Sequence, residues 1–377
     1  MVDEWTQEEM MMFLSTISEA ILYSCFALLM GSFIFSLIPT DLKPAILVSK
    51  KFKLIALAGI AVFSFMPILN LMVYLLEEYT FLYVLKSLLL TFEIGKAWIV
   101  TVILTIILGF FIYLFDNRNT PIYYIIGILL LFGIVAAMSW TTHSHAVYGI
   151  QGFITHFIHF STVIVWVGIL IIVAWFSKNK ENWIPFLNWF HVTALFCFAI
   201  ITVTGLSLMN YSMNISEYPN SWLQPYGQSL LIKHLFILPL IGYAFINGIL
   251  MKRKLGKKEK LDPRPWTKLE SIIVLAIFAA TGAMSQQEPP HNNASFSKDT
   301  FLQAYGILPS GQGSLVPLTV DIVANFKGIS LGILAVAFLV ISIYSFTKKM
   351  PPLFSFIMSI LLVVCALLAL SYSVVAY

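Results

Sequence analysis

Ten apolar runs constrain the fold of this chain more than any other feature. Each is close to the length of helix that crosses the hydrocarbon core of a bilayer, about 20 residues. Mean hydropathy is +0.89, and only 11% of the residues are charged, against about 25% in a soluble domain. The runs cover residues 13–37, 54–75, 97–115, 121–140, 153–176, 189–209, 229–250, 270–286, 328–346 and 353–375. We predict an all-α fold, a polytopic integral membrane helical bundle of about ten transmembrane helices.

The basic residues between these runs predict the orientation of the bundle. Lys and Arg concentrate in the loops on the cytoplasmic side of membrane proteins. If the first helix runs from outside to inside, the inner loops hold most of the 22 Lys and Arg residues, namely Lys43, Lys50, Lys51, Lys53, Arg118, Lys178, Lys180, Lys252, Arg253, Lys254, Lys257, Lys258, Lys260, Arg264, Lys268, Lys348 and Lys349. We therefore predict that both termini lie outside. The net charge of +4 then reflects membrane topology, with the 252–268 loop on anionic headgroups, and we expect no nucleic-acid partner.

The order of the runs predicts three parts. Residues 1–140 hold N-terminal membrane helices, with an interfacial helix near 80–92 that is too short to span. Residues 141–292 form a membrane core, and residues 293–377 add an outer segment and two C-terminal membrane helices. We expect a multi-pass protein surrounded by lipid.

Histidines gather at the predicted outer ends of the helices. His143 and His145 follow the fourth run, His156 and His159 lie in the fifth, and His234 lies in the seventh. An ionisable group inside a membrane is costly and marks a functional site by default, although each histidine could instead be bonded to a neighbouring helix. His156 and His159 share one helical face, and in an extended segment His143 and His145 would lie on one side. We predict that these five histidines bind a metal ion.

Methionines at the same end favour copper as that metal. Thioether is a soft ligand suited to Cu(I), whereas magnesium and calcium prefer carboxylates, which are sparse there. Methionine also packs well in apolar cores, so each residue taken singly has that alternative. The candidate accessory ligands are Met138, Met209, Met213 and Met284, together with His191 at the inner end of the sixth run.

The chain lacks the sequence motifs of common catalytic sites. It contains no glycine-rich phosphate loop and no Gly-x-Ser-x-Gly motif. We therefore expect no enzymatic activity and no ATP-driven pump within this chain.

Residues 140–292 resemble a known family, the copper resistance protein D (CopD) family of bacterial inner-membrane proteins. The matching motifs, in chain order, are His145-Ala146, His159-Phe160 with Trp166-Val-Gly168, Thr204-Gly205-Leu206, Tyr226-Gly227 with Lys233, and Asn247 with Lys252-Arg253 and Glu270. The chain departs from the family pattern at His156, where an acidic or polar residue is expected, and at His234.

The resemblance implies transport of copper across the bacterial inner membrane, in the direction of uptake. It also implies a periplasmic or extracellular copper-binding partner similar to CopC. Two alternatives remain. The family is similar to di-haem membrane cytochromes of the b561 type, so haem b and electron transfer form one alternative, with histidines as axial ligands. The other is a metal-binding scaffold for assembly or sensing.

Overall fold

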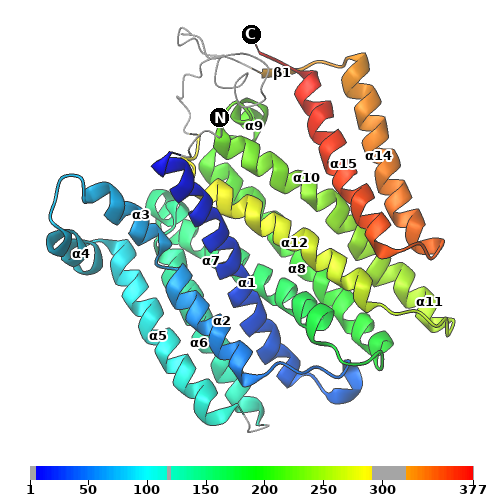
Figure 1. The fold of residues 1–377 in the computed structure, drawn as a ribbon, viewed down its shortest axis with the longest axis horizontal. Coiled ribbons are helices and arrows are strands. Elements are labelled where there is room, and N and C mark those ends of the chain that lie inside the picture. Colours follow the sequence, from blue (N-terminus) through cyan, green and yellow to red (C-terminus); the bar gives the residue numbers. More distant parts are fainter. Residues whose placement is uncertain (1–5, 117–119, 291–319, 377) are drawn as a thin grey trace. The chain divides into compact units, whose positions relative to one another are not determined.

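The computed structural model describes residues 6–116, 120–290 and 320–376. Two compact units divide the chain, Met1–Tyr211 and Ser212–Tyr377 (Figure 1). The described residues contain ten helices that are long and apolar enough to cross a membrane. The prediction of a polytopic helical membrane protein is confirmed, and each of the ten predicted runs overlaps one of these helices.

The first unit holds six of the candidate spans. One span is divided into two helices where Pro67 begins a new turn, since proline favours the first turn of a helix. The helices are α1 (Gln7–Leu37), α2 (Lys50–Phe63), α3 (Met66–Leu75), α4 (Phe81–Leu90), α5 (Glu93–Phe115), α6 (Pro121–Trp140), α7 (His143–Phe176) and α8 (Trp183–Ser212). The short apolar helix α4 coincides with the segment expected to be interfacial, and its place at a membrane surface stays a prediction.

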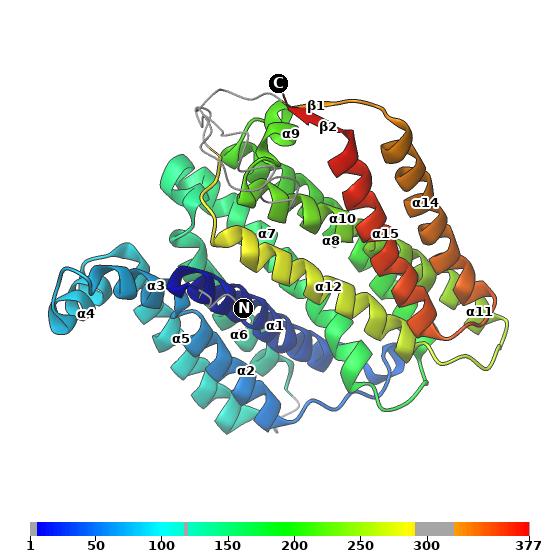
Figure 2. The ribbon, with the colours of Figure 1, turned by 45° about the horizontal axis from the view of Figure 1, so that its top comes forward.

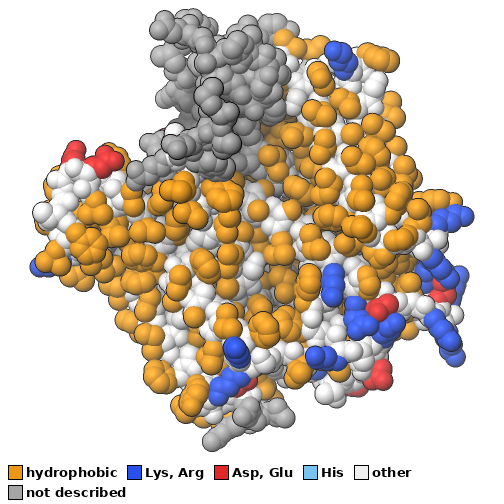
Figure 3. Space-filling view, in the orientation of Figure 1, with side chains coloured by type: hydrophobic (Ala, Val, Ile, Leu, Met, Phe, Trp, Pro, Cys, Tyr) orange, Lys and Arg blue, Asp and Glu red, His pale blue; other side chains and the backbone are white. Residues whose placement is uncertain are grey.

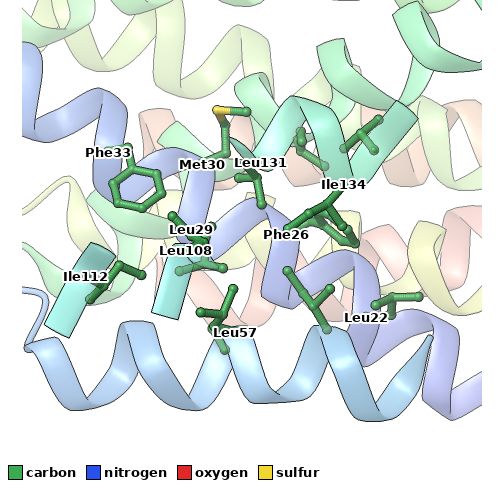
Figure 4. Close-up of a cluster of buried hydrophobic side chains, with 14 of the residues drawn as sticks. Leu22, Phe26, Leu29, Met30, Phe33, Leu57, Leu108, Ile112, Leu131 and Ile134 are labelled. Atoms are coloured by element: carbon green, nitrogen blue, oxygen red, sulfur yellow. The ribbon is translucent and has the colours of Figure 1, made fainter. Parts of the chain in front are cut away.

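An apolar core joins α1, α2, α5 and α6. Phe26, Leu29, Met30 and Leu131 are fully buried in it, and Figure 4 shows their side chains converging. Outward-facing positions on these helices are also apolar, as with Phe110, which is 65% exposed. In water such a surface would be costly, but in a bilayer it contacts lipid of the same polarity.

Two glycines bring α1 and α7 into backbone contact. A Cβ on Gly168 would lie 2.4 Å from the carbonyl oxygen of Ala27, and a Cβ on Gly31 would lie 2.1 Å from that of Gly168. Small residues permit this kind of close crossing between membrane helices. Gly168 of the Trp166-Val-Gly168 motif is therefore a packing residue, and it holds the histidine-bearing helix against α1.

The second unit holds the other four spans. Its elements are α9 (Tyr218–Ser221), α10 (Pro225–Phe245), a π-helical turn η3 (Ile246–Met251), α11 (Lys252–Gly256), α12 (Arg264–Ser285), β1 (Val320–Ile322), α14 (Phe326–Thr347), α15 (Pro352–Ser373) and β2 (Val374–Ala376). Helices α14 and α15 lie side by side (Figures 1 and 2). Strands β1 and β2 pair antiparallel, with Asp321 opposite Val375. The predicted outer segment at 293–319 lies outside the described residues.

Basic side chains of the second unit gather around α11. Figure 3 shows Lys and Arg at that end, whereas the helical surfaces beside it are largely apolar. Lys254 donates to the carbonyl oxygens of Phe346 and Thr347 at the end of α14, at 3.1 and 3.2 Å. A cation is favourable at a helix C-terminus. This end carries the 252–268 loop that was predicted to face the cytoplasm.

Candidate functional site

Gly149 creates a corner near the start of α7. Its φ of 55° with ψ of −134° is open to glycine but strained for other residues. The chain turns so sharply there that Ser144 donates a hydrogen bond of 3.3 Å to the carbonyl oxygen of Gly152. The corner separates a short first turn, which carries His143 and His145, from the long membrane-spanning part of α7.

His143 and His145 lie in a helical turn and not in an extended strand. At two residues apart on a helix they project to different sides, so the shared side expected for an extended segment is wrong. His143 is exposed, and His145 is half-buried against the ring of Trp140, with ring centroids 4.3 Å apart. Phe153 closes the other side at 6.1 Å. His145 is thus held beside the C-terminal end of α6 by aromatic contacts.

His156 is tied to α6 through a serine hydroxyl. Its Nδ1 lies 3.0 Å from Oγ of Ser139, a fully buried residue. The same hydroxyl donates its one hydrogen to the carbonyl oxygen of Val135 at 2.8 Å. With that hydrogen used, we assign the hydrogen of the second bond to Nδ1 of the imidazole. In the neutral ring this leaves the lone pair, which is what binds a metal, on Nε2.

His159 repeats this arrangement with a second neighbouring helix, α8. Its Nδ1 lies 2.9 Å from Oγ1 of Thr204, and Thr204 donates its hydroxyl hydrogen to the carbonyl oxygen of Ile200 at 2.7 Å. Nδ1 of His159 is again the donor, and the lone pair again falls on Nε2. Gly205 lets α8 approach, since a Cβ there would lie 3.4 Å from Cε1 of His159. Two imidazoles on one face of α7 thus share one tautomer.

Ser139 and Thr204 are functional candidates because their hydroxyls orient His156 and His159, a role that the sequence does not reveal. Thr204 belongs to the Thr204-Gly205-Leu206 motif, but only the structure pairs it with His159. Hydrogen bonds of this kind orient metal-binding histidines and fix their tautomer. Further contacts join α7 to α8, including Trp166 packed edge-on against Phe198, with ring centroids 6.2 Å apart.

His234 belongs to the second unit and is hydrogen-bonded to a phenol. Its Nδ1 lies 2.7 Å from the phenol oxygen of Tyr218. Burial raises the pKa of Tyr218 to about 12, so the phenol keeps its hydrogen at neutral pH. A phenol that keeps its hydrogen can donate to Nδ1 of His234, and in that arrangement the ring hydrogen lies on Nε2. Copper binding by Nε2 of His234 would require this bond to break or reverse.

The remaining predicted ligands are spread along several helices. In the first unit, Met138 is half-buried on α6, Met209 is buried on α8, and His191 is half-buried near the start of α8. In the second unit, Met213 is buried after α8 and Met284 is half-buried on α12. Within the described ranges, no three His, Cys, Asp or Glu side chains are grouped as metal ligands. The ligand assignments therefore stay predictions.

Comparison with known families places this geometry in context. Residues 10–153 match the family described as Copper resistance protein D-like, N-terminal domain. Residues 184–284 match Copper resistance protein D. The chain belongs to the copper resistance protein D family. No curated protein and no solved structure matches the chain. This chain is a multi-pass membrane protein with a role in copper resistance or copper transport.

Some of the candidate residues lie within the matched ranges, and two of them lie outside both. His143 and His145 lie within the first, and Thr204 and His234 lie within the second. His156 and His159 lie between the two ranges, so their assignment depends on the geometry of α7. Neither matched family supports the haem alternative, because both are described by copper resistance.

Proposed function

We propose that this CopD-family chain moves copper ions across the membrane toward the cytoplasm, through a His and Met site at its outer side. One observation carries the proposal. His156 and His159 lie on one face of α7, and a hydroxyl on a neighbouring helix fixes each Nδ1. Both rings therefore keep the metal-binding lone pair on Nε2, the arrangement expected of histidines prepared for a soft or borderline metal.

Copper would meet the outer residues of the first unit before the paired histidines. His143 is exposed and His145 lies beside Trp140, so both suit capture. The ion would then pass to His156 and His159, with His191 on the exit side. Accessory ligands within the first unit would come from Met138 and Met209, whereas Met213, Met284 and His234 stay candidates within the second unit.

The driving force would be the membrane potential together with binding of copper inside the cell. Each unit charge that moves inward gains about 2.3 kcal/mol per 100 mV. This accords with the absence of nucleotide-binding motifs from the sequence, and we propose a transporter without enzymatic activity. Its place would be a bacterial inner membrane, where a soluble partner similar to CopC would deliver copper from the outer side.

Copper content of cells tests the proposed direction. Cells that express the chain under copper limitation are expected to hold more copper than cells with an empty vector. The double variant His156→Gln with His159→Gln should lose this gain, whereas Thr162→Ala should keep it. Thr162 is a matched control, because it is half-buried on the same helix and its hydroxyl bonds to the carbonyl of Ile158 in that helix. Lower copper on expression would contradict uptake and indicate export.

An absorption spectrum of the purified protein tests the chemical class. The copper proposal predicts no Soret band, because the histidines bind copper and not haem. A Soret band at stoichiometric haem would overturn the transport proposal and favour electron transfer.

A further inference from the structure

A buried acid and a buried amide meet inside the second unit, outside the histidine site. Glu270 on α12 is 3% exposed, and Asn247 in the π-helical turn η3 is 4% exposed. Nδ2 of Asn247 donates 2.7 Å to Oε2 of Glu270 and 3.2 Å to the carbonyl oxygen of Trp266. Both residues fall within the span-forming helices. An ionisable group in that position is a functional candidate by default.

One acceptor oxygen of this pair has no hydrogen-bond donor. Both amide hydrogens of Asn247 are used, but its Oδ1 is buried without a hydrogen-bond partner. A buried unsatisfied acceptor costs about 1–3 kcal/mol. An ionised carboxyl can only accept, whereas a protonated one carries an O–H donor. A proton on Glu270 would add an O–H donor to the residue that already bonds Nδ2 of the same Asn247 amide, whose Oδ1 lacks a donor.

The charged groups around the pair do not provide another partner. Among the described residues, Glu270 takes part in no ion pair. Three elements of the second unit pack beside it, α10 with its π-helical turn, α14 and α15. Their titratable groups, with those at the ends of α12, are Tyr226, Lys233, His234, Tyr243, Lys252, Arg253, Lys254, Arg264, Lys268, Lys327, Tyr344, Cys365 and Tyr372. Tyr243 is held by Ser355 at 3.3 Å, and Arg264 is held by Asp262 at 2.7 Å.

We propose that Glu270 and Asn247 form a proton-binding site within the membrane-spanning part of the chain. The bound proton forms an O–H bond on the Glu270 carboxyl and completes an acid–amide pair with Asn247. When the proton leaves, a buried carboxylate faces an acceptor oxygen, and the pair must rearrange. The π-helical turn that carries Asn247 is the element we expect to rearrange, because such turns are rare and recur at functional sites. A link between this proton and copper movement rests on the proposed function above.

Infrared difference spectra of the purified protein in lipid vesicles test the site. Between about pH 5 and about pH 9 the spectrum reports protonated carboxyls through their C=O stretch. The wild-type protein is expected to show such a band, and Glu270→Gln is expected to lose it. Gln can keep the hydrogen bond from Asn247 without carrying the proton. Glu19→Gln is the matched control, since Glu19 also lies in a span and is bonded to Tyr23.

Two conservative variants keep the test decisive if Glu270→Gln fails to fold. Glu270→Asp should keep the band and shift it, and Asn247→Leu should shift it to the position of an acid with a weaker hydrogen bond. A wild-type spectrum without a band assignable to Glu270, or a band that Glu270→Gln leaves in place, would overturn the proposal.

Copper flux into the same vesicles tests the link to transport. Wild-type flux should change with an imposed proton gradient, and flux through Glu270→Gln should not. Equal dependence on the gradient in both proteins would overturn the link. If the wild-type protein moves no copper, the proposed function fails, while the infrared result still decides the proton site.

Discussion

Oγ1 of Thr204 lies 2.9 Å from Nδ1 of His159, and this bond joins α8 to the histidine-bearing helix α7. The threonine hydrogen is already donated to Ile200, so the imidazole donates and its lone pair falls on Nε2. The contact therefore sets which nitrogen can bind a metal. It also gives a chemical role to a threonine–glycine motif that sequence alone left unexplained.

Thr204→Val should weaken copper binding while all the histidines remain. The valine keeps the size of the side chain but removes the hydroxyl, so the His159 ring loses its orientation and its preferred tautomer. Loss of such an orienting bond lowers metal affinity by about 10–100-fold. Competition titration with a copper chelator measures the effect. Thr202→Val is the control, because Thr202 is exposed and bonds only to Phe198 of its own helix; equal losses in both variants would refute an orienting role.

His145→Ala combined with His159→Ala should abolish high-affinity copper binding and leave the fold intact. His145 precedes the corner of α7 at Gly149, and His159 lies in the long part of the same helix. In the proposed function, His145 captures copper and His159 binds it during passage. Copper titration gives stoichiometry and affinity, and far-ultraviolet circular dichroism checks the helices. Unchanged stoichiometry and affinity would rule out both residues as primary ligands.

His234→Ala should cost less copper affinity than His159→Ala. When Tyr218 donates to Nδ1 of His234, Nε2 of that ring carries the hydrogen and lacks the lone pair that a metal needs. Both single variants are compared in the same chelator competition. A larger loss for His234→Ala would show that the Tyr218 bond breaks when copper binds.

Gly168→Leu should destabilise the first unit. The first added carbon would already lie 2.4 Å from the carbonyl oxygen of Ala27, so α1 and α7 must separate. Overpacking of this kind costs about 1–3 kcal/mol or more, and the thermal unfolding midpoint in detergent should fall. Gly332→Ala is a control with no heavy atom within 4 Å of its added Cβ. It should hold or raise the midpoint, since Ala favours helix over Gly by about 1 kcal/mol.

His156→Asp should make copper binding less sensitive to acid. Protons compete with copper for an imidazole nitrogen, so binding to the wild-type site weakens as pH falls. A carboxylate stays ionised to lower pH than an imidazole stays neutral, so the variant should retain more of its affinity on the acid side. Binding curves between about pH 5 and about pH 8 decide this. Coincident pH profiles would mean that His156 does not bind the ion and only bonds to Ser139.

The helical architecture was predictable from sequence because the bilayer is a uniform solvent. A run of about 20 apolar residues has to satisfy its backbone internally, whatever its neighbours are. The ten runs were therefore sufficient to predict ten spans, and the start of α7 was the main difference. There the predicted run begins at 153, whereas α7 begins at His143, because α7 includes a short helical turn that precedes the corner at Gly149. The predicted boundaries at 140 and 292 stay predictions beside the division at Tyr211.

The sequence by itself determined the class of the protein, the number and spacing of its spans, and the presence of two imidazoles on one helical face. These are local properties, set by apolar length and by the helical repeat. Only the tertiary structure decided which hydroxyl meets which imidazole, that Ser139 and Thr204 fix the tautomers of His156 and His159, and that Asn247 meets Glu270. Such pairings depend on how helices far apart in the chain cross. Close contacts such as that of Gly31 with Gly168 set that crossing, and no local pattern records it.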